Sequence, residues 1–282
     1  MKQRQYDIRP EVINYDDIRK MIPFFDGKPE LVAKIMHFLR LDEVNRVHST
    51  YCDTPGIPFT RKLVEEEFKF RLRIDNAQAL AGFKDGPFIT VSNHPFGSYD
   101  GILLLYLVGM YRPDFKVMVN LFLNQISAMR PNFIAVDPMK SDDPVKKKIT
   151  LDGIREAMAL VREGHPIGFF PAGAISIINR HGWLEDNPWK PVVIRLIAQL
   201  KVPVIPIFFH GTNSFLFNFF GKVSWQLRTL RLPSEVWRKC GTEMHISVGQ
   251  PIMPDEIAAH SADLAELGEW LKARTFALRT NP

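Results

Sequence analysis

The sequence predicts an α/β fold: a mixed, mostly parallel sheet flanked by helices, with a helical segment in front of it. From about residue 85, short apolar runs typical of buried strands alternate with longer segments typical of helices. This alternation places helices on the faces of a parallel sheet. The earlier residues carry apolar side chains at helical spacing. We therefore expect an N-terminal helical segment, residues 1–80, and an α/β domain, residues 81–282.

Local breaks set the limits of these elements. Asp26-Gly27 separates the first two N-terminal helices, and a linker with Pro55-Gly56 precedes the last one. The expected N-terminal helices are Pro10–Phe25, Pro29–Leu41, Asp42–His48 and Arg61–Arg73. The expected strands are Phe88–Ser92, Phe115–Val119, Phe133–Val136, Ile167–Phe170, Val204–Phe209 and Met244–Val248. The later helices are Asp100–Gly109, Leu121–Met129, Pro144–Arg162, Pro191–Leu200 and Ala262–Leu278.

Composition narrows the classes of partner. Lys and Arg number 36 against 31 Asp and Glu, and the net charge of +5 suits an anionic membrane surface or an acidic carrier protein. No basic stretch is interleaved with stacking aromatic residues, so nucleic acid is not an expected partner. Cys52 and Cys240 form no ligand pattern, which predicts reduced thiols in a cytosolic compartment and no metal site. Neither a secretory leader after Met1–Asp7 nor a membrane span is expected, because the longest uncharged apolar run, Gly101–Tyr111, is too short.

His94 and Asp100 stand on a predicted turn between a strand and a helix. The run Pro87–Val91 is typical of a buried strand, and Ile102–Val108 is typical of a buried helix. Turns of this kind carry the chemistry in α/β folds, because packed elements fix them on both sides. A carboxylate that holds one histidine nitrogen leaves the other free to accept a proton, as in a general-base pair. The alternative is that Asn93 and Asp100 only cap the turn and the helix while His94 packs.

A second turn follows the apolar run that ends at Phe170. Pro171 and Gly173 are turn-forming residues, and such a turn exposes backbone N–H groups that can hold an anion or an oxyanion. An ordinary strand-to-helix turn is the alternative. No nucleophile elbow, zinc motif or nucleotide-binding loop is present in the sequence.

Several segments together resemble a known family. Asn93-His94 followed by Asp100 resembles the first motif of the glycerolipid acyltransferases, the lysophosphatidate acyltransferase superfamily. Phe170-Pro171-Ala172-Gly173 is similar to the third motif, and Val202–Ile207 to the fourth. The resemblance runs from about residue 38 to about residue 252, and with Asn187–Lys190 it is similar in form to the hemolysin-like or lyso-ornithine-lipid acyltransferase branch. It implies that His94 is the base, that Asp100 orients it, and that no cofactor takes part.

This chain departs from the family pattern in three places. Five residues separate His94 from Asp100, one more than in the usual motif. Ala172 and Ile175 replace the glutamate and arginine of the third motif, and Pro138 replaces the arginine of the second. Because those polar groups help to bind glycerol phosphate in the family, we expect lysophosphatidate to be a poor acceptor. The residues that we expect to contact substrate are Asn93, Gly97, Asn120, Asp137, Pro171, Ala172, Gly173, Ser176, Lys190 and Asn213.

The segment Phe215–Phe220 is the candidate membrane contact. It holds four phenylalanines within six residues, and basic and aromatic residues follow it, a combination that suits a lipid head-group interface. The alternative is that these side chains line the acyl pocket or fill the core. The expected contact residues are Phe215, Phe217, Phe219 and Phe220.

Together these observations predict an O-acyltransferase of membrane lipid biosynthesis. A thioester of acyl-carrier protein or coenzyme A donates the acyl group, and the hydroxyl of a singly acylated lipid accepts it. The resemblance implies an ornithine- or glycine-type lyso-aminolipid as acceptor. A lysophospholipid acceptor, thioester hydrolysis and a non-catalytic lipid-binding protein on the same fold are the alternatives. We expect a cytoplasmic protein that is peripheral on the inner face of the cytoplasmic membrane.

Overall fold

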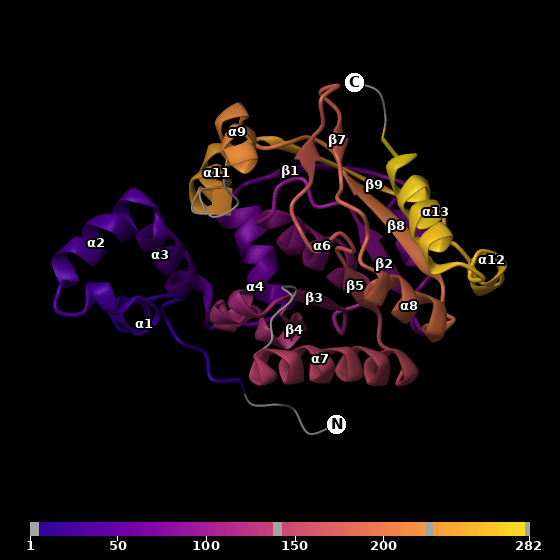
Figure 1. Ribbon diagram of the computed structural model, residues 1–282, viewed down its shortest axis with the longest axis horizontal. Helices are drawn as coiled ribbons and strands as arrows, with labels where there is room; N and C mark the ends of the chain where they lie inside the picture. The colour runs from indigo at the N-terminus through magenta and orange to yellow at the C-terminus, as the bar shows by residue number, and fades with distance from the viewer. Residues whose placement is uncertain (1–5, 138–142, 224–227, 230, 280–282) are drawn as a thin grey trace.

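A seven-stranded sheet forms the centre of the computed structural model, which describes residues 6–137, 143–223, 228–229 and 231–279 (Figure 1). The strand order is β1-β9-β8-β2-β5-β3-β4. The last five strands in this order are parallel to one another, whereas β9 is antiparallel to β8 and parallel to β1. The prediction of a mixed, mostly parallel sheet is confirmed. The strands are Arg71–Asp75 (β1), Ile89–Ser92 (β2), Lys116–Asn120 (β3), Phe133–Val136 (β4), Ile167–Phe169 (β5), Val204–Phe209 (β8) and Glu243–Val248 (β9), with a separate hairpin of Ile177–Ile178 (β6) and Leu184–Glu185 (β7).

Helices cover both faces of the sheet, as the two parts of the hydrophobic core show. One part joins α6 to α4 and η2, and the other joins α7, α8 and α13. Helix α6 is buried along most of its length, because the apolar run Leu103–Leu105 faces the sheet and α4 together. The helices of the α/β part are Gln78–Ala81 (α5), Tyr99–Gly109 (α6), Leu121–Gln125 (η3), Ser127–Asn132 (η4), Pro144–Arg162 (α7), Pro191–Leu200 (α8), Phe215–Val223 (α9), Leu232–Arg238 (α11), Pro254–Ala259 (α12) and Leu264–Phe276 (α13).

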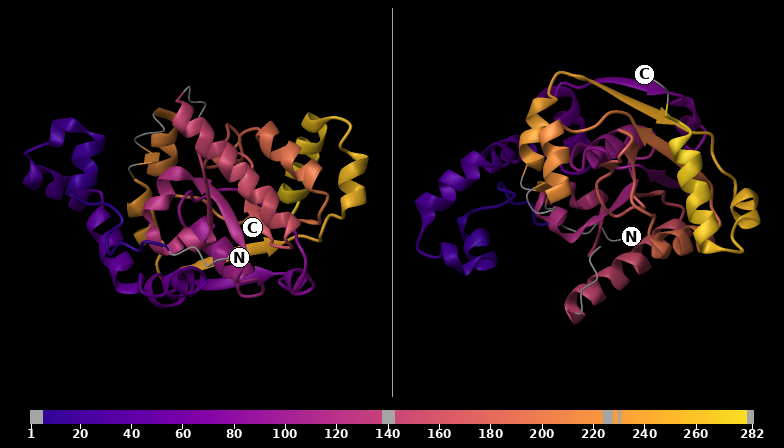
Figure 2. Two further views of the ribbon diagram at one scale, coloured as in Figure 1. Left: turned by 90° about the horizontal axis from the view of Figure 1, so that it is seen from below. Right: turned by 45° about the horizontal axis from the view of Figure 1, so that its top comes forward.

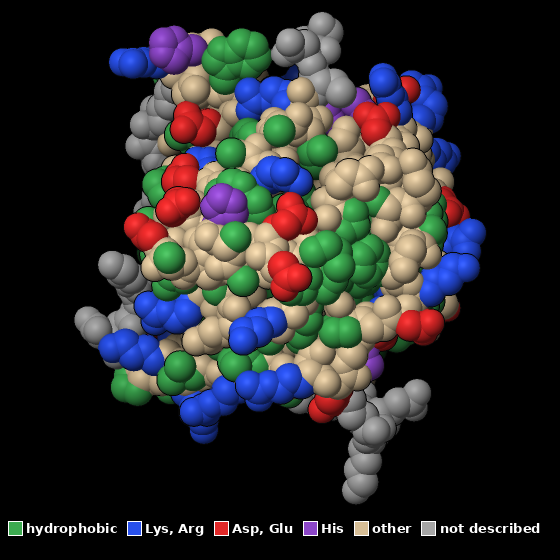
Figure 3. Space-filling model, turned by 90° about the vertical axis from the view of Figure 1, so that its right-hand side faces the viewer, with side chains coloured by type: hydrophobic (Ala, Val, Ile, Leu, Met, Phe, Trp, Pro, Cys, Tyr) green, Lys and Arg blue, Asp and Glu red, His purple; other side chains and the backbone are tan. Residues whose placement is uncertain are grey.

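The N-terminal helices α4 and η2 pack in the core, and the helices before them, residues 15–51, form an arm at one end of the molecule (Figure 2). Its large apolar side chains are unusually exposed, whereas charged and apolar side chains are interspersed over the face that carries α12 and α13 (Figure 3). The exposed apolar residues of the arm are Met21, Ile22, Phe24, Leu31 and Phe38. The N-terminal helices are Tyr15–Met21 (α1), Pro23–Phe25 (η1), Pro29–Phe38 (α2), Leu41–Tyr51 (α3), Ile57–Lys62 (α4) and Leu63–Glu67 (η2).

Two expected helices are wrong. The segment Arg61–Arg73 does not stay helical, because the chain turns at Lys69, which has a φ of 51°, and continues as β1. That strand forms by pairing with β9, about 170 residues later in the sequence, so local spacing could not indicate it. The segment Leu121–Met129 divides into two 3₁₀ helices, η3 and η4. The division of the chain at residue 80 stays a prediction.

None of the helices in the described residues is long and apolar enough to cross a lipid bilayer. The strongly apolar helix α6 has only 11 residues and is buried against the sheet. Its apolar character therefore reflects its place in the core of the protein.

Candidate active site

The carboxyl ends of five parallel strands meet at one edge of the sheet. Strand β2 lies at the centre of this edge, between β8 and β5, and His94 follows it directly. Neighbouring strands lie about 4.8 Å apart, so the loops after β8, β2 and β5 are close enough to build one site. Ends of parallel strands are also where open α/β sheets place their ligands.

His94 and Asp100 are paired at this central position. Nδ1 of His94 lies 2.6 Å from Oδ2 of Asp100. The same carboxylate oxygen accepts hydrogen bonds from the backbone N–H of Phe96, at 3.0 Å, and of Gly97, at 2.8 Å. Asp100 has an exposed fraction of 0% and lies in the first turn of α6, where the helix dipole favours a negative charge. The additional residue between the two side chains therefore does not separate them.

The loop leaves the outer nitrogen of the imidazole accessible. Nε2 of His94 has no hydrogen-bond partner among the described residues, and the imidazole ring packs on Phe170, with ring centroids 4.3 Å apart. Gly97 has a φ of 76°, and a Cβ there would lie 2.2 Å from Cδ1 of Ile175. A glycine is thus needed both for the backbone conformation and for the close approach of the second turn.

The second turn supplies unpaired backbone donors next to His94. The N–H of Gly173 is not among them, because it donates to the carbonyl of Phe170 at 2.9 Å. The N–H groups of Ala174 and Ile175 have no partner in the part of the chain that the structure describes. Ala172, at the position of the family's glutamate, is buried. The backbone donors expected around Gly173 are therefore available one and two residues later.

Two predicted substrate contacts hold the loop that carries His94. The side-chain amide of Asn93 exchanges two hydrogen bonds with the backbone of Phe209, at 2.9 and 2.7 Å, and so joins the ends of β2 and β8. The amide of Asn213 donates to the carbonyl of Phe96 at 2.8 Å. Both asparagines are buried, and the carbonyl oxygen of the Asn213 side chain has no partner among the described residues.

Two other predicted contacts lie along the same edge but away from its centre. Asn120 ends β3 and accepts a hydrogen bond from the N–H of Phe122 at 2.9 Å. Asp137 follows β4, the outermost strand, where Lys146 and Thr150 of α7 contact it. Three strand spacings separate β4 from β2, which amounts to about 14 Å. The structure therefore does not bring Asp137 to His94. Pro138, in the second motif, lies outside the described residues.

Ser176 and Lys190 do lie beside the central loops. The hydroxyl of Ser176 accepts the N–H of His94 at 3.1 Å, and the N–H of Ser176 donates to the carbonyl of His94 at 2.9 Å. The N–H of Lys190 donates to the carbonyl of Pro171 at 2.8 Å, and its aliphatic chain covers Gly173. The ammonium group of Lys190 is exposed and has no ion-pair partner in the described ranges.

No sequence motif indicates Asp186, which the structure places behind the second turn. Its carboxylate is buried and accepts hydrogen bonds from the hydroxyl of Ser176, at 2.5 Å, and from Nε1 of Trp189, at 3.1 Å. Burial raises the pKa of this carboxyl group above its ordinary value. Trp189 and Lys190 lie in a segment that resembles the family, but no motif of the family includes Asp186, which directly precedes this segment.

One group of side chains in the described residues brings possible metal-ligand atoms together, where β8 ends beside β9 and β1. Atoms of Asp75, His210 and His245 lie within 4.8 Å of one another. The two imidazole rings are stacked, 3.8 Å apart and at 9°, so their lone pairs lie side by side and do not converge on one point. Nε2 of His245 contacts Asp75 at 2.6 Å, and burial lowers the pKa of His210 to about 4. This group is built as a hydrogen-bond network.

Comparison with known proteins identifies the family of the chain. The model of an acyltransferase family matches residues 38–281, which include the turns after β2 and β5. The chain belongs to this acyltransferase family. It is an enzyme of acyl transfer.

Several individual proteins are similar to this acyltransferase. A lyso-glycine lipid O-acyltransferase of Bacteroides thetaiotaomicron is 25% identical over 266 residues, which cover 92% of each chain. One of Phocaeicola vulgatus is 25% identical over 240 residues, 83% of this chain and 80% of that protein. A chloroplastic 1-acyl-sn-glycerol-3-phosphate acyltransferase of Brassica napus is 30% identical, but over only 47% of this chain and 35% of its own. The crystal structure of PlsC, the 1-acyl-sn-glycerophosphate acyltransferase of Thermotoga maritima, is 14% identical and gives a TM-score of 0.47 over 95% of each chain.

Proposed function

We propose that this acyltransferase moves a fatty acyl group from a thioester of acyl-carrier protein or coenzyme A to the hydroxyl of a lyso-aminolipid of the glycine or ornithine type. The observation that carries the proposal is the His94–Asp100 pair on the central strand, with Nε2 of His94 accessible. Two relatives that are similar over most of the chain are named lyso-glycine lipid O-acyltransferases, which supports an aminolipid acceptor.

The chemistry needs one base and one anion site. Nε2 of His94 takes the proton of the acceptor hydroxyl, and the hydroxyl oxygen attacks the carbonyl carbon of the thioester. Asp100 stabilises the imidazolium that forms, and the N–H groups of Ala174 and Ile175 stabilise the oxyanion. The C–S bond then breaks, and the thiolate receives the proton from His94, so that the ester and the free thiol leave a neutral imidazole. Proton transfer by such a base contributes about 10²–10⁴-fold in rate.

The acceptor head group is expected near the turn after β5. Ala172 is buried and Ile175 packs on Gly97, so neither position offers a charge to a glycerol phosphate. Among the described residues, Lys190 offers a cation beside Gly173. An N-acylated glycine carries one carboxylate, which a single ammonium group can bind, whereas a phosphate monoester is best held by several donors. The geometry therefore favours the aminolipid over lysophosphatidate.

An acceptor panel tests this assignment. Thiol release from one acyl thioester is measured with lyso-glycine lipid, lyso-ornithine lipid, lysophosphatidate and no acceptor, with both carrier-protein and coenzyme A donors. We expect release that depends on the aminolipid, and a higher KM for lyso-glycine lipid in Lys190→Gln with kcat unchanged. A preference for lysophosphatidate would contradict the acceptor assignment. Release without any acceptor would indicate a hydrolase, and no release with either donor would favour a lipid-binding protein.

The protein is also proposed to dock on the membrane surface through two exposed apolar regions. On α9, Phe215 is 85% exposed and stacks on exposed Phe219. The prediction for Phe217 is wrong: its exposed fraction is 0%, because it lies on the opposite side of the helix and packs into the protein. Phe220 is half-buried, with the Arg231 guanidinium over its ring. The arm provides the second region, where the Lys28 ammonium lies 3.6 Å from the Phe24 ring centroid. Apolar side chains flanked by cations suit an anionic bilayer surface.

Vesicle binding tests the docking surface. Phe215→Ser/Phe219→Ser should weaken binding to vesicles that contain phosphatidylglycerol and leave the melting temperature unchanged. Phe217→Ser is the matched control from the same helix: it should destabilise the fold by about 3–5 kcal/mol, as loss of a buried phenylalanine does. Unchanged binding of the double variant would remove α9 from the docking surface, and Phe24→Ser/Phe38→Ser tests the arm in the same assay.

A further inference from the structure

Asp186 is a buried carboxylate that reaches the catalytic loop through one side chain. Its exposed fraction is 2%, and both of its oxygens accept hydrogen bonds, Oδ1 from the hydroxyl of Ser176 and Oδ2 from Nε1 of Trp189. Neither oxygen is open to a substrate. Asp186 is therefore not a second base, and its effect on the reaction must pass through the groups that it holds.

Ser176 in turn holds the backbone of His94 from both sides. Its hydroxyl, which donates to Asp186, accepts the N–H of His94, and its own N–H donates to the carbonyl of His94. A hydroxyl has one proton and can rotate, so by itself it does not define a direction. The carboxylate accepts a hydrogen bond from that hydroxyl and thereby directs an oxygen lone pair of Ser176 toward the N–H of His94.

The segment that contains Asp186 also supports the second turn. Lys190 donates its N–H to Pro171, and Lys272 of α13 donates through Nζ to the carbonyl of Asp186 at 2.9 Å. Hydrogen bonds from the segment 186–190 thus hold the turn 171–176 in place. This turn carries the unpaired N–H groups of Ala174 and Ile175 directly in front of Ser176.

We infer that Asp186 and Ser176 are positioning residues of acyl transfer, which fix the base His94 and the two backbone donors of the second turn relative to each other. The inference rests on the proposed role of His94. Catalysis of this kind requires Nε2 and the anion site to meet at one carbonyl carbon, so a small displacement of either group lowers the rate of the chemical step. Substrate binding, in contrast, does not depend on this alignment.

Steady-state kinetics of four variants test the inference. Ser176→Ala and Asp186→Ala should each lower kcat by about 10²-fold, as a displacement of about 1 Å does, with KM for donor and acceptor unchanged. Asp186→Asn retains an oxygen that can accept the Ser176 hydroxyl, so its kcat should lie between those of Asp186→Ala and the wild type. The double variant Ser176→Ala/Asp186→Ala should be no slower than either single variant, because the two residues act as one unit.

Ser247 offers a matched control. Like Ser176 it is buried, and its hydroxyl donates to an aspartate, Asp75, at 3.0 Å, but it has no contact with His94 among the described residues. Ser247→Ala should therefore keep the wild-type kcat, even where it lowers the melting temperature as much as Ser176→Ala does. Equal kcat values for Ser176→Ala, Asp186→Ala and Ser247→Ala would overturn the inference, and so would additive losses in the double variant.

His94→Ala separates this inference from the proposed function. If His94→Ala is inactive while Ser176→Ala and Asp186→Ala keep their kcat, the positioning role alone is wrong. If His94→Ala is as active as the wild type, the proposed base is wrong and the inference fails with it. In the expected case His94→Ala is inactive and adding Ser176→Ala causes no further loss.

Discussion

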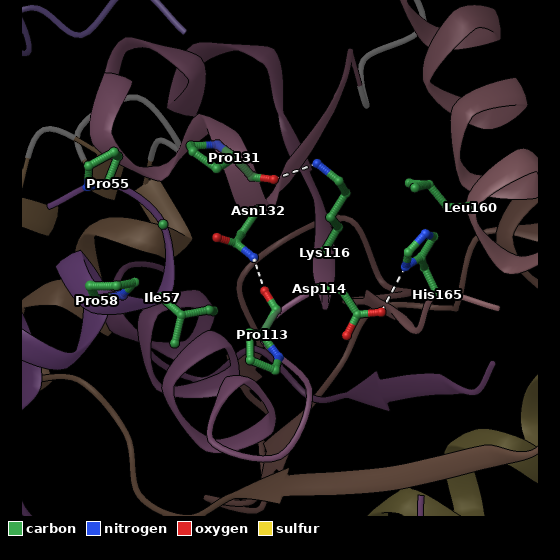
Figure 4. Close-up of a pocket in the computed structure, with 11 residues that line it drawn as sticks. Pro55, Ile57, Pro58, Pro113, Asp114, Lys116, Pro131, Asn132, Leu160 and His165 are labelled. Atoms are coloured by element: carbon green, nitrogen blue, oxygen red, sulfur yellow. Dashed lines mark hydrogen bonds and ion pairs between the residues drawn. The ribbon is translucent and has the colours of Figure 1, made fainter. Parts of the chain in front are cut away.

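Two histidine–aspartate pairs lie at opposite edges of the same sheet. His94 Nδ1 is 2.6 Å from Asp100 Oδ2 at the carboxyl edge, and His165 Nδ1 is 2.7 Å from Asp114 Oδ2 at the amino edge. A cavity of about 320 Å³ lies beside the second pair, lined by prolines and by Lys116, whose ammonium donates to the carbonyl of Pro131 (Figure 4). The two distances do not separate the pairs, and the cavity would favour the second, yet only the first lies where the family motif and the strand ends meet.

The charge around each carboxylate explains the difference. Asp114 accepts two hydrogen bonds from Arg112, at 2.9 and 2.7 Å, and its side chain is 34% exposed. Its charge is already balanced, so it has little stabilisation to give to an imidazolium. Asp100 has no lysine or arginine among its described partners, and besides His94 it contacts only the neutral backbone N–H groups of Phe96 and Gly97. An unbalanced, buried carboxylate therefore supports the proposed catalytic role of the His94–Asp100 pair over that of the His165–Asp114 pair.

The largest difference between the pairs should appear on removal of the histidines. His94→Ala should lower kcat by about 10²–10⁴-fold, the usual contribution of a general base. His165→Ala should leave kcat unchanged and alter stability by at most about 1 kcal/mol, as a partly exposed ion pair does. Thiol release and chemical denaturation measure the two effects. A slow His165→Ala variant with a normal fold would move the active site to the amino edge.

Neutralising the carboxylates should give a smaller contrast. Asp100→Asn removes the charge that stabilises the imidazolium, and a hydrogen bond to a charged group contributes about 1.5–3 kcal/mol, or about 10- to 150-fold in rate. Asp114→Asn should keep the wild-type kcat. Both variants are compared at saturating donor and acceptor. If Asp100→Asn were fully active, the contact between His94 and Asp100 would have no role in the transition state.

Two glycines with positive φ, one near each histidine–aspartate pair, allow the same comparison to be made with backbone substitutions. Gly97 has a φ of 76° beside Ile175, and Gly56 has a φ of 83°, where a Cβ would lie 2.8 Å from Oδ1 of Asn132. A residue with a side chain held at such a positive φ costs about 1–3 kcal/mol, so both Gly97→Ala and Gly56→Ala should lower the free energy of unfolding. Only Gly97→Ala should also lower kcat, since it displaces the second catalytic turn. Loss of kcat in the Gly56 variant as well would show that the two edges are coupled.

The smallest expected effect is the pH dependence of the amino-edge pair. Burial alone would raise the pKa of Asp114, but the hydrogen bonds from Arg112 and His165 outweigh it and lower the pKa below the ordinary 3.8. A carboxylate with a lowered pKa contributes stability that is present above its unfolded pKa and is lost as the pH falls through its folded pKa.

We therefore expect Asp114→Asn to be less stable than the wild type by about 1 kcal/mol at neutral pH, and the difference to vanish in acid. Urea denaturation over a pH series measures it. The exposed Asp85 provides the control, because Asp85→Asn should match the wild type at every pH. A difference that instead grows in acid would mean that the pairing with Arg112 does not stabilise the fold.

The sequence predicts those elements whose signal is local. Strand Phe133–Val136 and helices Pro144–Arg162 and Pro191–Leu200 have the predicted bounds, because proline at the start of each helix and a continuous apolar pattern mark them. Local spacing predicts a helix where β1 forms, since the pairing that makes this segment a strand comes from β9 at the other end of the chain. No local pattern indicates the hairpin of β6 and β7, because each of its strands has only two residues.

The pairing of His94 with Asp100 could be predicted from the sequence because both residues lie on one short turn. His94 and Asp100 are close in the chain, so one sequence motif contains both, and the family match covers both. Other features could be found only in the tertiary structure. They depend on contacts between segments that are far apart in the sequence, or on which side of a helix faces the protein core. The tertiary structure placed Asp186 behind Ser176, assigned Asn93 and Asn213 to the support of the loop, and turned Phe217 inward while Phe215 stayed outside. Burial and hydrogen bonding are properties of the packed chain, and residue spacing does not contain them.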